Sequence, residues 1–396
     1  MTETPKVTRR RFLEIGSGIT LVAAAGVLWR ANERGVFADP MGEAYAPWQM
    51  WQAPEYANTP LALVAAGILA SNPHNTQPWI FRVTDTQIDI LADTRRHLGT
   101  FDPYLREMHL GLGCAVENMA LAAAPNSFAA DVEYAPGSLL DIAGRDGQVL
   151  AAKLRLTRTV AATDPLHAAI PVRHTDRNPY DTARPLAAEA LAGLAHDGDI
   201  RLWLFGEGEA RDRLGAAIVE ATDEIVADKQ MIEDSHHWFR DGPDEIAREK
   251  SGLALDTAGL SPALLAAAKF LPALPAEQSH GAWANQTRDN HVPTAALLGL
   301  IATRDRYDRS QALAAGRFWQ RLHLTAAAEG ISMHPLNQPV ETIDRERQLG
   351  SEAKSEARLA AITGDESWQP TFAFRAGYPT RVVRTSARRG VADVVV

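Results

Sequence analysis

Cysteine is almost absent from this sequence of 396 residues, in which Cys114 is the single example. One cysteine excludes an intrachain disulfide, a cysteine-rich zinc site and a C-x-x-C redox pair. Because Cys114 lies in the apolar stretch of residues 110–124, we expect a buried thiol that packs as a small hydrophobic side chain.

The signatures of several enzyme classes are also missing. The sequence contains no G-x-S-x-G motif and no H-E-x-x-H motif. The adjacent His236 and His237 would point about 100° apart on a helix, and Gly111 and Gly113 lack the third glycine of a dinucleotide fingerprint. We therefore predict no catalytic side chain and no metal ligand.

Net charge and composition exclude further classes of protein. A formal net charge of −9 argues against a general nucleic-acid-binding protein, so no nucleic-acid partner is expected. With 46% hydrophobic and 22% charged residues, a chain of this length can bury one large core or two smaller ones.

Residues 1–38 have the features of an export signal. Three arginines at positions 9–11 precede Phe12 and Leu13, an uncharged run over residues 15–29 follows, and small residues come next. The pattern resembles a twin-arginine signal, whose export machinery carries folded proteins. Because the uncharged run is shorter than the ~20 residues of a comfortable membrane span, we expect an exported protein without a stable span. An uncleaved signal that anchors the protein to the membrane is the alternative.

The most informative stretch is S-N-P-H-N-T-Q-P-W at residues 71–79. It lies between an apolar helical run at 61–70 and a hairpin predicted from alternation at 79–83 and 87–91. Amide side chains offer donors and acceptors together, which suits the edge of a flat heterocycle. An ordinary turn, in which such side chains satisfy local backbone groups, is the alternative. The candidate side chains are those of Ser71, His74, Asn75 and Gln77.

A second polar stretch, P-V-R-H-T-D-R-N-P-Y, covers residues 171–180. Arg173, His174, Thr175 and Arg177 bring cationic groups and a hydroxyl close together, a set that could hold a phosphate dianion. A solvated charged loop is the alternative.

Two further stretches lie near the end of the chain. A helix predicted over 310–330 ends at Gly330 and leads into H-P-L-N-Q-P-V-E, for which a proline-rich turn is the simple interpretation. A predicted strand at 371–377 precedes S-A-R-R. The candidate side chains here are Pro335, Leu336, Asn337, Arg388 and Arg389.

Regular structure is predicted around these stretches from the spacing of apolar residues. Arg106 and Glu107, at the start of one predicted helix, are interpreted as structural ion pairs or caps. Helices are expected over 104–124 and 210–226, and strands over 151–160, 200–205 and 297–303.

Together these motifs resemble the nitroreductase superfamily over roughly residues 55–396. S-x-x-H-N-T-Q-P-W resembles its flavin-binding loop and R-x-T-x-R its phosphate-binding start. P-L-N-Q-P-V-E and the closing R-A-G-Y-P with S-A-R-R are similar to the Acg-type branch. In that branch, two nitroreductase-like halves lie in one chain.

The resemblance implies FMN as the cofactor. Asn75 and Gln77 would hold the pyrimidine edge of the flavin, and Arg173 would anchor its phosphate with help from Arg388 or Arg389. His174 stands where the common pattern has a second arginine. The implied cofactor-binding residues are Ser71, His74, Asn75, Gln77, Arg173, Thr175, Arg177, Pro335, Leu336, Asn337, Arg388 and Arg389.

The implied fold is α+β, with two tandem halves forming an intrachain pseudo-dimer, each a mainly antiparallel sheet flanked by helices. The halves would cover residues 39–165 and 166–396, with a lid insertion around 231–290. The amide loop occurs only in the first half and the arginine motif only in the second. One composite FMN site per chain is therefore expected. The pseudo-dimer could be monomeric or could dimerise again.

The implied function is that of an FMN-dependent oxidoreductase of the nitroreductase type. It would pass electrons from a small-molecule donor to a small acceptor such as a nitroaromatic compound or a quinone, with the flavin carrying the electrons. A non-catalytic FMN-binding or storage protein with a lid-closed site is the alternative. A structural protein on a decayed nitroreductase scaffold is the third interpretation.

Overall fold

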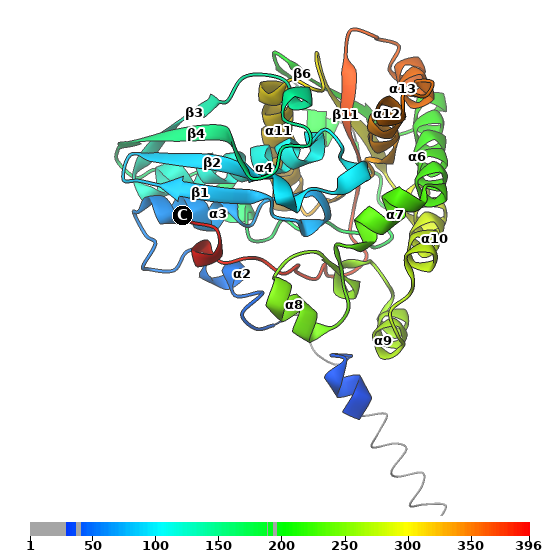
Figure 1. Cartoon of the computed structure of the whole chain (residues 1–396), viewed down its shortest axis with the longest axis horizontal. Helices are drawn as coiled ribbons and strands as arrows, with labels where there is room; N and C mark the ends of the chain where they lie inside the picture. The colour runs from blue at the N-terminus through cyan, green and yellow to red at the C-terminus, as the bar shows by residue number, and fades with distance from the viewer. Residues whose placement is uncertain (1–28, 37–40, 188, 193–195) are drawn as a thin grey trace, which may run out of the picture.

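The computed structural model describes residues 29–36, 41–187, 189–192 and 196–396. The predicted twin-arginine motif lies outside these residues. Two separate antiparallel sheets are flanked by helices (Figure 1). The α+β architecture predicted from the sequence is therefore confirmed.

The first sheet contains the predicted hairpin and two further strands, all paired antiparallel. Ile88 and Ile90 alternate with more exposed residues and are fully buried, as expected of strands with one covered face. The strands, in spatial order, are β1 (Trp79–Val83), β2 (Gln87–Asp93), β4 (Gln148–Arg158) and β3 (Phe128–Tyr134).

The second sheet comes from the later part of the chain and is also antiparallel. Its central strand β9 (Leu297–Thr303) is buried at every position, which explains its unbroken apolar sequence. In the sequence, the predicted boundary at residue 165 lies after the last strand of the first sheet and before the first strand of the second. The division into tandem halves itself stays a prediction. The spatial order is β10 (Ser332–Pro335), β11 (Gln369–Gly377), β9, β6 (Ile200–Phe205) and β5 (His196–Asp197).

The helices expected at 61–70, 104–124, 210–226 and 310–330 are all present. No helix in the described ranges has the length and apolarity that crossing a bilayer requires. The helices are α2 (Pro47–Met50), α3 (Pro60–Gly67), α4 (Arg106–Ala123), α5 (Glu189–Ala192), α6 (Glu209–Ala227), α7 (Lys229–His236), α8 (Pro243–Glu249), α9 (Pro262–Phe270), α10 (Ala276–Gln286), α11 (Arg309–Ala328), α12 (Gln338–Leu349) and α13 (Lys354–Thr363).

Helices α4 and α11 pack against each other in the middle of the molecule (Figure 1). Two glycines permit the close approach: a Cβ at Gly113 would collide with the carbonyl oxygen of Leu313, and one at Gly316 with that of Leu110. Beside them, the Sγ of Cys114 donates to the carbonyl of Gly316 at 3.2 Å. The buried thiol expected from the sequence is thus confirmed, and it lies in this interface.

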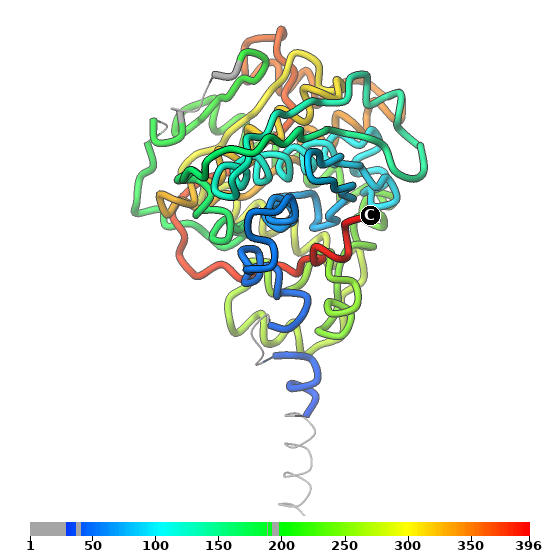
Figure 2. Tube along the Cα trace, turned by 90° about the vertical axis from the view of Figure 1, so that its left-hand side faces the viewer, coloured from blue at the N-terminus to red at the C-terminus, as the bar shows by residue number. Residues whose placement is uncertain are grey.

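The carboxyl-terminal segment returns to the first sheet (Figure 2). Phe81 of β1 donates its N–H to the carbonyl of Val394 at 2.8 Å and accepts from Val396 at 2.9 Å. The chain end therefore extends the edge of a sheet whose other strands lie more than 230 residues earlier in the sequence. Residues 386–389, just before this pairing, are held by hydrogen bonds to Trp48, Ala44 and Gln77.

Candidate functional site

The loop at residues 71–79 has a backbone conformation that few L-residues adopt. His74, Asn75 and Gln77 have positive φ angles of 45°, 55° and 50°. Such conformations cost roughly 1–3 kcal/mol each and persist only where the surroundings impose them, often at functional sites. The Oδ1 of Asn72 accepts the N–H of Gln77 at 2.8 Å, which closes the loop.

The amides of Asn75 and Gln77 bind the backbone of other segments. Asn75 Nδ2 donates to the carbonyl of Gly252 at 3.2 Å, and Gln77 Nε2 to that of Lys250 at 2.7 Å. Gln77 Oε1 accepts the N–H of Arg389 at 2.7 Å. Neither side chain lines the cavity beside the loop. Their contact with a flavin edge stays a prediction, and their described role is to join the loop to two other segments.

A cavity of about 620 Å³ lies beside this loop, between α4, the second sheet and residues 235–286. Its volume is within the range of ligand sites, roughly 300–1,000 Å³. Leu336 is fully buried in a separate apolar cluster and does not line it. The predicted site residues that line the cavity are Ser71, His74, Thr175, Arg177, Pro335 and Asn337.

Residues 235–286 form one wall of the cavity and coincide with the predicted lid insertion. This wall is largely apolar, and α9, α10 and the segments before and between them contribute to it. Whether it moves stays a hypothesis. Its lining side chains include Phe239, Leu253, Leu264, Leu271 and Trp283.

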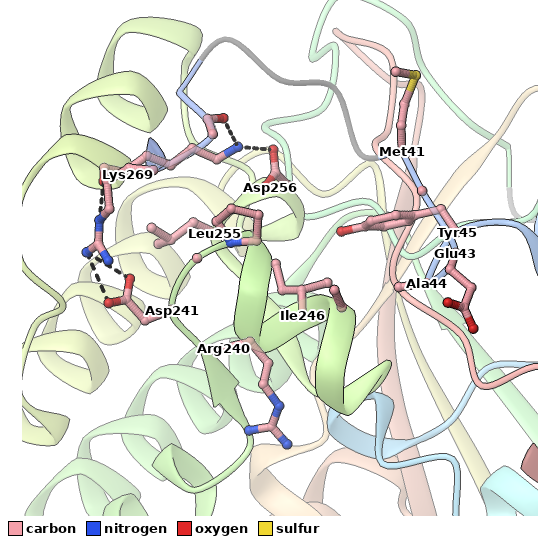
Figure 3. Close-up of a pocket in the computed structure, with 16 residues that line it drawn as sticks. Met41, Glu43, Ala44, Tyr45, Arg240, Asp241, Ile246, Leu255, Asp256 and Lys269 are labelled. Carbon is pink, nitrogen blue, oxygen red and sulfur yellow. Dashed lines mark hydrogen bonds and ion pairs between the residues drawn. The ribbon is translucent and has the colours of Figure 1, made fainter. Parts of the chain in front are cut away.

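An amino-terminal strap, residues 29–36, holds this wall from the outside. Arg34 pairs with Asp241 at 3.0 Å. Lys269 pairs with Asp256 at 2.8 Å and also donates to a strap carbonyl at 3.0 Å. Figure 3 shows Lys269 pointing toward Asp256 beside a smaller cavity of about 170 Å³. Because Lys269 and Asp256 are nearly buried, their pair is screened less than a surface ion pair.

A hydrogen-bonded chain connects the loop to the wall formed by residues 235–286. His280 Nδ1 donates to the carbonyl of Ala276 at 2.8 Å, so its Nε2 accepts from Ser235 Oγ at 3.0 Å. Ser235 Oγ then accepts from His74 Nε2 at 2.9 Å. Because its Nε2 accepts, the imidazole of His280 must be neutral in this arrangement, whereas the donating Nε2 of His74 is compatible with either charge state of that ring.

Protonation of His74 should destabilise the protein. Burial, followed by the nearby His280 and Arg177, lowers the pKa of His74 to about 3 from an ordinary value of 6.5. The unfolded chain therefore binds a proton near pH 6.5 that the folded chain excludes down to about pH 3, and stability falls as the pH drops through this window.

Because the His74 ring is partly exposed to the cavity, we expect it to contribute about 1–2 kcal/mol of the stability lost at pH 4. Thermal unfolding at pH 7 and pH 4 should show a smaller decrease for His74→Gln than for the unaltered protein. Equal decreases would contradict this assignment.

Two buried arginines meet just before the loop. Arg173 Nη2 donates to the carbonyl of Leu69 at 3.1 Å, and Arg388 Nη2 to that of Ala70 at 3.4 Å. Their exposed fractions are 2% and 3%. Arg389 instead bonds the backbone of Gln77, so Arg388 is the arginine that accompanies Arg173.

This pair has unused hydrogen-bonding capacity. Arg173 Nε and Nη1, Arg388 Nε and the nearby His323 Nδ1 have no partner. Burial lowers the pKa of Arg173 to about 10, and burial together with Arg173 lowers that of Arg388 well below its usual range. No carboxylate among the described residues contributes to either shift. Buried cations are ordinarily paired, so the arrangement fits a bound anion such as a phosphate.

Sequence reasoning did not identify three polar residues of the cavity wall. Glu107, interpreted as structural, faces the cavity together with Gln338 and Glu341. The carboxamide of Asn337 donates to Glu107 and accepts the N–H of Ala373 at 3.1 Å. The sequence shows that these residues are polar. Their proximity could not be predicted, because it depends on the packing of α4 against α12. Among the described residues, no group of three His, Cys, Asp or Glu side chains could hold a metal ion.

Fold and site together define an α+β protein in which a buried cationic site adjoins a ligand-sized cavity. No family model matches the chain. It is 27% identical over 291 residues to "Putative NAD(P)H nitroreductase Rv3131" of Mycobacterium tuberculosis strain H37Rv, a match that covers 72% of this chain and 78% of the relative. The corresponding protein of strain CDC 1551 gives the same values.

Solved structures of nitroreductases are similar over part of the chain. The FMN-dependent nitroreductase NfnB of Mycobacterium smegmatis has a TM-score of 0.34 at 16% identity, covering 56% of this chain and 94% of that one. A nitroreductase of Bacteroides fragilis with bound FMN has a TM-score of 0.33 at 14% identity, covering 57% and 96%. Scores of this size carry no functional argument, and the sequence similarity is the stronger finding.

Proposed function

We propose that this protein is an FMN-dependent oxidoreductase of the nitroreductase type, with one FMN bound between its two sheets. The main support for this proposal is the pair of buried arginines, Arg173 and Arg388. No carboxylate in the described part of the chain contributes to their pKa shifts, and three of their guanidinium nitrogens have no hydrogen-bond partner there. The similarity to NAD(P)H nitroreductases, at 27% identity over 72% of the chain, supports the same reading.

The residues present fit a flavin mononucleotide. Arg173 and Arg388 would hold its phosphate, since guanidinium groups offer paired donors to phosphate oxygens. Ser71, His74 and Thr175 line the adjoining cavity and would contact the rest of the molecule. When bound, the flavin supplies the electron transfer. The protein's own tasks are to hold the ring, to exclude water with residues 235–286 and to leave space for an acceptor.

Purification of the full chain tests this proposal directly. We expect a yellow protein whose released cofactor has the mass of FMN, and whose absorbance near 450 nm bleaches on mixing with NADPH, as about that wavelength is where oxidised flavins absorb. A colourless protein that takes up no added FMN would refute the proposal. A yellow protein that NADPH and NADH leave oxidised would favour the storage alternative.

The storage alternative has one specific observation in its favour. In a chain that keeps residues 29–36, this strap holds the wall of residues 235–286 through the Arg34–Asp241 pair and through the hydrogen bond from Lys269 to the carbonyl of Gly35. Lys269 also pairs with Asp256 within the wall. Cleavage of a signal that covers residues 1–38 would remove the strap. A lid held in this way would slow the entry of an acceptor. Substitution of Lys269 by Ala should accelerate flavin reduction if the lid limits access, and should leave the rate unchanged if it does not.

We further propose that the chain is an Acg-type protein exported through the twin-arginine machinery. The sequence T-R-R-R-F-L and the uncharged run that follows it support this proposal. Anchoring by an uncleaved signal remains the alternative. Cell fractionation of the protein with Arg9→Lys and Arg10→Lys together should show retention in the cytoplasm, and unchanged export would contradict the proposal.

A further inference from the structure

One part of the cavity wall is formed by hydrogen-bond acceptors. Glu107 is the second residue of α4, and Gln338 and Glu341 lie in the first turn of α12. All three line the cavity, and their exposed fractions are 7%, 3% and 7%. Acidic residues in a first helical turn are favoured by the helix dipole, so the carboxylates alone do not indicate a ligand.

Several carboxyl groups share the cation beside these residues, Arg106. Arg106 is fully buried and pairs with Asp344 at 2.8 Å, while it lies 3.6 Å from Glu107 Oε1. Asp344 also accepts from the hydroxyl of Tyr307 at 2.8 Å. Asp102 adds a further carboxylate, whose oxygens accept the N–H groups at the start of α4. One arginine thus faces four carboxyl groups.

The carboxyl groups of Glu107 and Glu341 share a proton. Their carboxyl groups are hydrogen-bonded to each other, and burial raises the pKa of both. Two carboxylates in such contact cannot both be ionised at neutral pH. The pair therefore carries at most one negative charge, and its ion pair is with Arg106 at 3.6 Å, a guanidinium that pairs more closely with Asp344.

Two acceptor atoms on this wall are left without a donor. Glu341 Oε2 and Gln338 Oε1 have no hydrogen-bond partner. A buried acceptor without a partner costs about 1–3 kcal/mol, so a ligand that donates hydrogen bonds here would relieve that cost. Gln338 is the independent indication, because its amide carries no charge and has no role in neutralising Arg106.

We propose that Glu107, Gln338 and Glu341 form a subsite for a protonated amine, and that the ligand carrying this amine has an aromatic body. The apolar wall contributed by Phe239, Trp283 and the side chains of α9 would pack against that body. That the ligand is an electron acceptor rests on the proposed function, whereas the subsite itself does not. The acceptor would be a cationic compound and not an anionic one.

Three matched nitroaromatic compounds test the subsite. 4-Nitrobenzylamine, 4-nitrotoluene and 4-nitrobenzoate differ chiefly in charge at one position. Calorimetric titration of the FMN-loaded full chain at pH 7 should show the amine binding at least 10-fold more tightly than the toluene, and the benzoate more weakly than both. The Glu341→Gln protein should lose this preference, with the affinity for 4-nitrotoluene changing less than 3-fold.

Controls separate the subsite from general effects. Glu352→Gln removes a carboxylate whose side chain is 80% exposed and should leave all three affinities unchanged. Glu107→Gln provides a second variant, and a thermal melt of each protein establishes that it is folded. Equal affinity for the three compounds, no binding of any of them, or an amine preference that survives both substitutions would overturn the subsite.

The same titration distinguishes failure of this inference from failure of the proposed function, because binding requires no electron transfer. A chain that takes up no FMN but still prefers the amine would refute the proposed function and support the subsite. An amine preference found only in FMN-free protein would show that the cofactor itself covers these residues, and would overturn the inference about the acceptor.

Discussion

The Arg173→Met protein should purify without FMN, with its affinity for added FMN reduced at least 100-fold. Removing one member of a buried, charge-assisted contact commonly costs 2–5 kcal/mol, and about 2.7 kcal/mol corresponds to 100-fold. Methionine keeps much of the side-chain volume and introduces no new polar group. Titration of FMN followed by flavin fluorescence measures the change.

The stability of the FMN-free variant should move the other way. Arg173 is a buried cation with two nitrogens that have no partner, and replacing buried charges by apolar groups is often neutral or stabilising. Thermal melts of cofactor-free proteins should therefore show an equal or higher Tm for Arg173→Met. Arg155→Met, at a position 56% exposed and paired with Glu133, is the matched control and should retain FMN. Full FMN retention by Arg173→Met would refute the phosphate site.

Gly316→Val should prevent the protein from folding stably, with a loss above about 4 kcal/mol. Any side chain at this position in α11 would collide with the backbone of Leu110 in α4. Because the obstacle is a helix backbone and not a flexible side chain, it cannot move aside without separating the two helices. Urea unfolding followed by circular dichroism would measure the loss, and insoluble expression would be its extreme form.

Gly281→Ala is the matched control for this substitution. Gly281 lies within α10, and an added Cβ would meet no atom within 4 Å. Alanine there should stabilise the protein by about 0.5–1 kcal/mol, since glycine disfavours helix interiors. A Gly316→Val protein with the stability of the unaltered chain would show that α4 and α11 are not in close contact.

The regular elements could be predicted because their signals are local. The apolar spacing in α4 and α11 and the alternation in β1 and β2 each depend on neighbours within a few residues. The positions of Gly113 and Gly316 carry no such signal, since their meaning depends on a helix about 200 residues away. Sequence reasoning accordingly rejected a dinucleotide fingerprint at Gly113 but did not anticipate the helix contact.

The candidate site was predicted in outline and not in its contacts. The segments around residues 71, 173, 335 and 388 do come together. Which side chain faces the cavity was not predictable, because the positive φ angles of the loop turn Asn75 and Gln77 toward other backbone segments. The side chain of Asn75 also accepts from Arg388 at 2.6 Å, so Asn75→Ala would weaken flavin retention through Arg388.

The return of the chain end to β1 sets the order of events during biosynthesis. Arg388 lies six residues before Val394, which pairs with Phe81 together with Val396, so this pairing helps to hold the segment that carries Arg388. The anion site also needs Arg173 and the carbonyls before Ser71, so it draws on segments made early, midway and last. FMN can therefore be captured with full affinity only by a chain in which residues 386–396 have been made. A chain truncated near residue 390 should emerge without its flavin.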